Sequence, residues 1–183
     1  MSVRVAKHST LVLGIGNILL SDEGAGIHAL QYLRSRYPEI PGVRYLDGGT
    51  LSFTLAGDIE STENLIVFDA ARLGAPPGTV RCLVGEAMDH FLGKGRQSVH
   101  EVGLADLMDI ARLTGTFPKR RALIGIQPAD LGWGEAPSAT VSQAFPEVAR
   151  HTRRLIELWS AQDKRSVSMD NADRCEQRPG VFP

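Results

Sequence analysis

The stretch 11–26, LVLGIGNILLSDEGAG, constrains the fold more than any other part of the chain. Its apolar start, residues 11–13, is typical of a strand buried on both faces in a parallel sheet. Gly14 and Gly16 then permit a tight turn that side chains would obstruct. Residues 21–23, Ser-Asp-Glu, supply the capping and acidic groups expected where a helix begins. The stretch predicts a strand, a glycine turn and a helix, with carboxylates at the sheet edge where open α/β folds bind ligands.

A dinucleotide site is the first alternative for a strand, a glycine turn and a helix. The fingerprint G-x-G-x-x-G requires a third glycine where this chain has Leu19. Asp22 and Glu23 follow, and carboxylates at this place repel phosphate and attract a cation. We therefore expect a cation at this edge and keep a nucleotide-binding α/β protein as an alternative.

Apolar runs and amphipathic segments alternate along the chain, which predicts a single three-layer α/β/α domain over residues 1–160. Helices on both faces of a mostly parallel sheet follow from this alternation. The link after the third strand is too short for a crossover helix, so the fourth strand should run antiparallel at an edge. The five expected strands are 10–15, 43–46, 64–68, 79–84 and 121–126.

The helices are expected at 24–37, at 51–59, after residue 101, and at 138–160. Pro146 falls inside the last of these and should kink or divide it. The polar sequence after residue 160 has no apolar periodicity, and we expect residues 161–183 to be a disordered tail.

Composition limits the partners and the compartment. Lys and Arg number 20 against 21 Asp and Glu, a net charge of −1, so we expect neither a nucleic-acid nor a membrane partner. Cys82 and Cys175 are the only cysteines, which fits a reducing compartment without a disulfide framework. No apolar run approaches the ~20 residues of a membrane span, and the polar start is unlike a signal peptide. We expect a cytoplasmic, soluble monomer.

Three side chains with metal-binding chemistry lie at predicted sheet-edge junctions: Glu23, Asp69 and His100. In a sheet ordered 2-1-3 the first and third strands are neighbours, so Glu23 and Asp69 should face each other at the topological switch point. Two carboxylates in a dry crevice are tolerated if a cation or a proton lies between them. With His100 they form a mixed N/O set suited to a borderline transition metal.

Each member of this set also has a simpler explanation. Glu23 would stabilise the helix dipole from the first turn. Asp69 would cap the turn after the third strand, and His100 would be a histidine of a surface loop. Asp22 competes with Glu23 for the ligand role, and their adjacency in the sequence leaves that choice open.

Two loops have both structural and functional explanations. Residues 47–50, Asp-Gly-Gly-Thr, form either a turn closed by an Asx hydrogen bond or a loop that grips a substrate. Trp133, between two glycines, is either a core aromatic or a wall of the cleft. Serine hydrolysis lacks its G-x-S-x-G motif. Cys82 in a strand and Cys175 in the tail are poorly placed as nucleophiles.

Five blocks carry a family resemblance: GIGNILLSDEGAG, LDGGT, VFDAA, SVHEVGLAD and GIQP, in this order and at this spacing. The sequence resembles the hydrogenase maturation endopeptidases, which process the large subunit of nickel-iron hydrogenases. The likeness covers residues 10–159. It is greatest to the proteases that serve membrane-bound uptake hydrogenases.

The resemblance implies a substrate and a mechanism. Such proteases remove a short C-terminal extension from the large-subunit precursor after nickel insertion. The nickel-contacting residues of the family correspond to Glu23, Asp69 and His100. Family members are typically isolated without metal, because the nickel belongs to the precursor and is the recognition signal. We expect water to attack the scissile carbonyl beside Asp69 and Asp47, with Asp69 as the base because a strand end holds it rigidly.

Three other classes of protein remain open. A conventional metallopeptidase would retain its own metal when purified. A nucleotide-binding α/β protein would be stabilised thermally by NAD or a nucleoside triphosphate. A non-catalytic, nickel-dependent chaperone of the large subunit would bind the precursor without cutting it.

Overall fold

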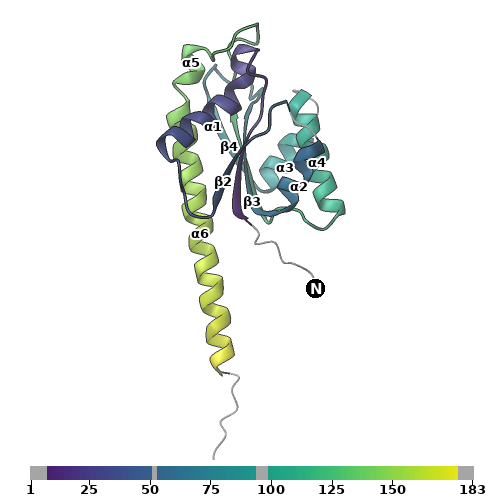
Figure 1. Cartoon of the computed structure of the whole chain (residues 1–183), viewed down its shortest axis with the longest axis vertical. Helices are drawn as coiled ribbons and strands as arrows, with labels where there is room; N and C mark the ends of the chain where they lie inside the picture. The colour runs from purple at the N-terminus through teal and green to yellow at the C-terminus, as the bar shows by residue number, and fades with distance from the viewer. Residues whose placement is uncertain (1–7, 51–52, 94–98, 177–183) are drawn as a thin grey trace, which may run out of the picture.

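The computed structural model describes residues 8–50, 53–93 and 99–176. A five-stranded sheet forms its centre, in the order β2-β1-β3-β5-β4, with helices on both faces (Figure 1). The strands are β1 His8–Gly14, β2 Val43–Asp47, β3 Thr62–Ala70, β4 Val80–Val84 and β5 Arg120–Ile126. The helices are η1 Ser21–Gly24, α1 Ala25–Arg36, η2 Phe53–Leu55, α2 Ala56–Glu60, α3 Glu86–Gly93, α4 Val99–Leu113, α5 Ala139–Ser142 and α6 Phe145–Glu176.

The predicted sheet is confirmed. Strands β1, β2, β3 and β5 are parallel, and β4 pairs antiparallel with β5 at one edge. Gly14 at the end of β1 pairs with Asp47 on one side and with Phe68 on the other. Because the register is shared, the carboxyl ends of β1, β2 and β3 lie next to one another.

Alternate residues of the strands face two separate apolar cores. Val12, Ile66 and Ile124 point toward the face covered by α1, α5 and α6. Leu13 and Val67 point toward the face covered by α2, α3 and α4. Figure 1 shows these two helical layers on opposite sides of the sheet. The inner strands are therefore buried on both faces, as their unbroken apolar sequence predicts.

The predicted division of the last helix at Pro146 is confirmed. The short α5 ends at Ser142, and α6 begins at Phe145. Pro146 thus lies in the first turn of α6, where its missing N–H would have no partner within the helix.

The predicted disordered tail is wrong for residues 161–176, which continue α6; residues 177–183 lie outside the described part of the chain. The loss of apolar periodicity was misread. It marks the point where the helix loses its packing partner, and the segment contains neither Gly nor Pro to end the helix. Figure 1 shows the end of α6 extending beyond the sheet and the other helices.

None of the helices in the described ranges combines the length and the hydropathy that crossing a membrane requires.

We expect residues 166–183 to be dispensable for stability. Arg120 of β5 donates hydrogen bonds to the carbonyl of Trp159 and to the carboxylate of Asp163, which fastens this part of α6 to the sheet. A chain that ends after Arg165 should keep its Tm. A chain that ends at Leu158 loses the buried Trp159, and removing such a side chain from a core costs about 3–5 kcal/mol.

Thermal unfolding followed by circular dichroism distinguishes these chains. For a protein of this size about 1 kcal/mol corresponds to a Tm change of about 2–4 °C. A Tm of the chain that ends after Arg165 that is lower than the wild-type Tm by more than about 4 °C would contradict the prediction.

Candidate active site

Three strand ends meet at the carboxyl edge of the sheet, and backbone hydrogen bonds hold the loop after β1 between its neighbours. Ile15 donates its N–H to the carbonyl of Phe68 at 3.0 Å, and Gly16 donates to the carbonyl of Gly49 at 2.8 Å. The loop is thereby tied to β3 on one side and to the segment after β2 on the other. It then leads directly into η1, which carries Glu23.

Glycines let η1 and α1 approach β3 closely. A Cβ atom at Gly26 would lie 2.3 Å from the carbonyl oxygens of both Ile15 and Phe68. At Gly16, where φ is 145°, a Cβ would lie 2.1 Å from the carbonyl oxygen of Glu23. Neither contact is sterically allowed, so only glycine permits this packing. The packing places Glu23 beside the end of β3.

Asp22 is fully buried and accepts four hydrogen bonds from the loop between β5 and α5. Its Oδ2 accepts from the backbone N–H groups of Ala129 at 2.8 Å and Asp130 at 2.9 Å. Ser138 donates its N–H to Oδ1 at 2.6 Å and its hydroxyl to Oδ2 at 2.9 Å. We call these four residues the Asp22 network. It joins η1 to a loop more than one hundred residues later in the chain.

Two opposing effects set the pKa of Asp22. Burial removes water from the carboxylate and on its own would raise the pKa. The hydrogen bonds from Asp130, Ser138 and Ala129 stabilise the charged form and outweigh burial, so the pKa lies below its ordinary value. Asp22 is therefore a charged structural group. Its acceptor capacity is used inside the protein, which leaves Glu23 as the candidate ligand of the pair.

Glu23 and Asp69 lie at the carboxyl edge of the neighbouring strands β1 and β3, as predicted. Glu23 is half-buried in η1, which packs beside β3. Asp69 is fully buried, with both carboxylate oxygens enclosed, and is paired in register with Gly125 of β5. The strand continues one residue further, to Ala70, so Asp69 lies within it and does not cap the turn that follows.

His100 lies in the first turn of α4, so its predicted place in a loop is wrong. The described residues from Val99 to Leu113 are helical throughout, although Gly103 lies among them. The side chain of His100 lies outside the described part of the chain. Among the side chains that are described, no three His, Cys, Asp or Glu residues are grouped to hold a metal. The set of Glu23, Asp69 and His100 stays a prediction.

Asp47 closes a turn at the end of β2. Its Oδ1 accepts a hydrogen bond from the N–H of Gly49 at 2.9 Å, which is the Asx bond expected from the sequence. The residue is exposed and is paired in register with Gly14 of β1. Asp47 therefore lies at the same sheet edge as Glu23, and its substrate-gripping role stays a prediction.

Trp133 is 86% exposed, so of its two explanations the core aromatic is wrong. The loop that carries it, between β5 and α5, is the part of the site that sequence reasoning missed. Ser138 and Asp130 hold Asp22 from this loop, yet their separation from Asp22 in the chain gives no periodic or motif signal. The adjacency of Asp22 and Glu23 in the sequence did not show which of them had this structural role.

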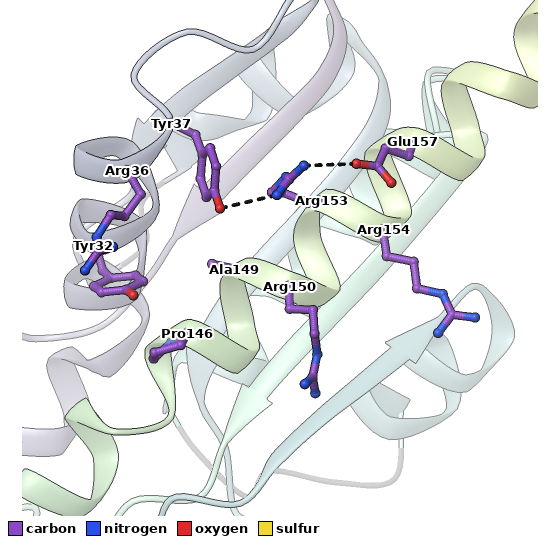
Figure 2. A pocket seen from close by; sticks show the side chains of 9 residues that line it. All are labelled: Tyr32, Arg36, Tyr37, Pro146, Ala149, Arg150, Arg153, Arg154 and Glu157. Carbon is purple, nitrogen blue, oxygen red and sulfur yellow. Dashed lines mark hydrogen bonds and ion pairs between the residues drawn. The ribbon is translucent and has the colours of Figure 1, made fainter.

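A cavity of about 560 Å³ lies between α1 and α6, away from this edge (Figure 2). Four arginines line it: Arg36, Arg150, Arg153 and Arg154. Arg153 donates to the hydroxyl of Tyr37 at 3.3 Å and to Glu157 at 3.4 Å. The cavity is strongly basic, so it is unsuited to a divalent cation and is not the predicted metal site.

The Asp22 network makes a prediction for Asp22→Asn. The asparagine NH₂ group would face N–H donors, and a hydrogen bond to a charged group contributes about 1.5–3 kcal/mol. We expect the variant to be less stable by at least that amount at pH 7. Because the folded pKa of Asp22 is lowered, its contribution is complete above the unfolded value, 3.8, and is lost as the pH falls through the lower folded value.

Denaturant unfolding between pH 7 and pH 3 measures both effects. The stability difference between wild type and Asp22→Asn should shrink below about pH 4. Asp106→Asn, on the exposed face of α4, is the matched control and should change little. Equal stability of the wild type and Asp22→Asn at pH 7 would contradict the structural role of Asp22.

Known proteins with similar sequences and folds identify the family. A family model described as hydrogenase maturation protease, HycI, matches residues 27–158. The hydrogenase expression/formation protein HoxM of Cupriavidus necator is 35% identical over 150 residues, which cover 81% of this chain and 74% of HoxM. The hydrogenase 2 maturation protease of Escherichia coli is 42% identical over 123 residues, which cover 66% of this chain and 74% of that protein.

Solved structures agree with the sequence matches. The hydrogenase maturating endopeptidase HybD from Escherichia coli superposes with a TM-score of 0.76 at 34% identity, covering 81% of this chain and 92% of HybD. The [NiFe] hydrogenase maturation protease HybD from Thermococcus kodakarensis gives a TM-score of 0.69 at 26% identity, covering 80% and 98%. With this fold, and with a family match over most of its length, the chain belongs to the hydrogenase maturation protease family and is a peptidase.

Proposed function

We propose that this peptidase removes the C-terminal extension of a nickel-iron hydrogenase large-subunit precursor, and that nickel already inserted in the precursor is its recognition signal. The observation that carries the proposal is that η1, which carries Glu23, packs beside β3, the neighbour of β1, and that Asp69 lies near the carboxyl end of β3. Ligands bind at such switch points in open α/β sheets. The family match supplies the class of reaction and of substrate.

The nickel is part of the substrate in this proposal. Glu23, Asp69 and His100 would complete its coordination from the protease side, and oxygen and imidazole donors suit a borderline transition metal. Asp22 is not among the ligands because the β5–α5 loop occupies it. The metal therefore determines both where the precursor docks and when it can dock.

The cleavage step needs an activated water and a base. We assign the base to Asp69, which makes the enzyme an aspartyl-type endopeptidase. Water attacks the scissile carbonyl, its proton passes to the Asp69 carboxylate, and that proton is then delivered to the leaving amine. Asp47, on the neighbouring β2 end, would orient the peptide.

The burial of Asp69 adds a requirement to this mechanism. Both of its carboxylate oxygens are enclosed in the free protein, so the precursor must displace whatever covers them before the carboxylate can act. Glu23 is half-buried and needs no such step. A protease whose base is uncovered only by its substrate would be inert toward other proteins, which agrees with gating by nickel.

The first test compares nickel-free and nickel-loaded precursor. Purified protein should shorten only the nickel-loaded large subunit, because the metal supplies ligand bonds that the free peptide lacks. Each 1.4 kcal/mol of lost interaction lowers the rate about tenfold. Mass spectrometry of the large subunit follows the reaction.

Three other outcomes of this experiment are decisive. Equal cleavage of both forms would overturn nickel recognition. Binding without cleavage of either form would indicate a chaperone. Stoichiometric metal in the purified protease, with cleavage of the nickel-free form, would indicate a conventional metallopeptidase.

The second test separates the roles of the site residues. His100→Ala and Glu23→Gln should weaken precursor binding and cleavage together, since each removes one ligand. Asp69→Asn should reduce cleavage further, because it also removes the base, and a general base contributes about 10²–10⁴-fold. Single-turnover rates and precursor affinity are measured for each variant.

His90→Ala, an exposed histidine of α3, is the matched control and should behave as wild type. If Asp69→Asn cleaves no more slowly than Glu23→Gln, the base is not Asp69.

A further inference from the structure

Two loops at the carboxyl edge expose four large apolar side chains. Ile18 and Leu19, in the loop between β1 and η1, are 43% and 49% exposed. Leu131 and Trp133, in the loop between β5 and α5, are 45% and 86% exposed. We call these four residues the apolar rim. Single exposed apolar residues are ordinary on protein surfaces, but here four lie on two loops that contact each other.

The two loops are fixed to one another. Gly134 donates its N–H to the carbonyl of Leu19 at 3.0 Å, and Ser21 donates to the carbonyl of Gly134 at 2.7 Å. The Asp22 network closes the same contact from the other side, at Ala129 and Asp130. In Figure 1 the loop before α5 and the segment before α1 meet at the upper end of the sheet.

An ordered loop that presents tryptophan to water is an unfavourable arrangement for an isolated protein. An indole buries a large apolar area when it is packed against other side chains. Trp133 lies between two glycines and remains 86% exposed to water. Ordered, exposed aromatic and aliphatic side chains are typical of binding sites, in which Trp is over-represented among the residues that dominate affinity.

We propose that the apolar rim is the docking surface for the folded body of the hydrogenase large-subunit precursor. This rests on the proposed function. Ile18 and Leu19 precede Glu23 by only a few residues on the same segment. Leu131 and Trp133 lie on the loop that the Asp22 network fastens to that segment. A folded protein that delivers a peptide to Glu23 must therefore come against the rim.

The surroundings of the rim define the partner surface further. Asp130 and Glu135, both exposed, are the charged residues of the Trp133 loop. The complementary surface on the precursor is accordingly an apolar patch bordered by Lys or Arg. Such a contact adds affinity without touching the scissile bond, so the rim positions the precursor while Glu23, Asp69 and His100 engage the metal.

The experiment measures cleavage of nickel-loaded precursor by Trp133→Ala, Leu131→Ala and the control Leu113→Ala. Leu113, at the end of α4, is 88% exposed and lies far from the rim in the fold. We expect Trp133→Ala to raise KM at least about tenfold, which corresponds to 1.4 kcal/mol of binding. Leu131→Ala should raise KM less, and Leu113→Ala should match wild type. The kcat values and the Tm should stay unchanged.

A conservative variant keeps the result interpretable. Trp133→Phe retains an exposed aromatic ring and should recover most of the affinity that Trp133→Ala loses. If Trp133→Ala acted only by unfolding the loop, its Tm would be lower than that of the wild type. A KM for Trp133→Ala equal to that of wild type overturns the rim proposal and leaves the proposed function standing.

Failure of the proposed function looks different. If the wild type does not cleave nickel-loaded precursor, the rim is tested by precursor affinity alone, and equal Kd values for wild type and Trp133→Ala overturn it. If sedimentation shows that Trp133→Ala separates a dimer into monomers while KM is unchanged, the rim binds a second copy of the chain and the proposal is wrong.

Discussion

The buried carboxylate of Asp22 is the interaction on which the shape of the site depends. Its four hydrogen bonds hold the β5–α5 loop against the segment before α1, and each donor would lose its partner if the side chain were removed. A charge can be buried in this way because four hydrogen bonds compensate for the lost water. The neighbouring Glu23 follows Asp22 directly in η1, which packs beside β3. Of these two adjacent acidic residues, Asp22 therefore has a structural role.

Much of the fold could be predicted because the signals were local. Each signal predicts the structure of the residues that carry it: the apolar runs predict β1 and β3, the short link predicts an antiparallel β4, and the proline predicts the break before α6. The sheet order then follows from connection rules. The end of α6 was mispredicted because apolar periodicity reports packing, whereas helix formation past Ser160 depends on the absence of helix breakers.

The site was only partly readable from the sequence. The strand order was predictable because parallel strands end at one edge, and it puts the carboxyl ends of β1 and β3 side by side. That Glu23 and Asp69 face each other there stays a prediction. The choice between Asp22 and Glu23 needed the β5–α5 loop, whose contact with Asp22 spans more than one hundred residues and follows no period. Trp133 was ambiguous for the same reason: sequence gives its flanking glycines but not whether another element covers it.

The course of α6 separates the two ends of the molecule. The helix begins near the carboxyl edge, where Ser138 holds Asp22, and passes Arg120 at the opposite edge before it leaves the sheet. Residues 164–176 add about 20 Å of helix beyond that point, at a rise of about 1.5 Å per residue. The described end of α6, at Glu176, therefore lies at the pole opposite the candidate active site. A fluorophore attached at that end of α6 would report on precursor binding without competing for the proposed docking surface.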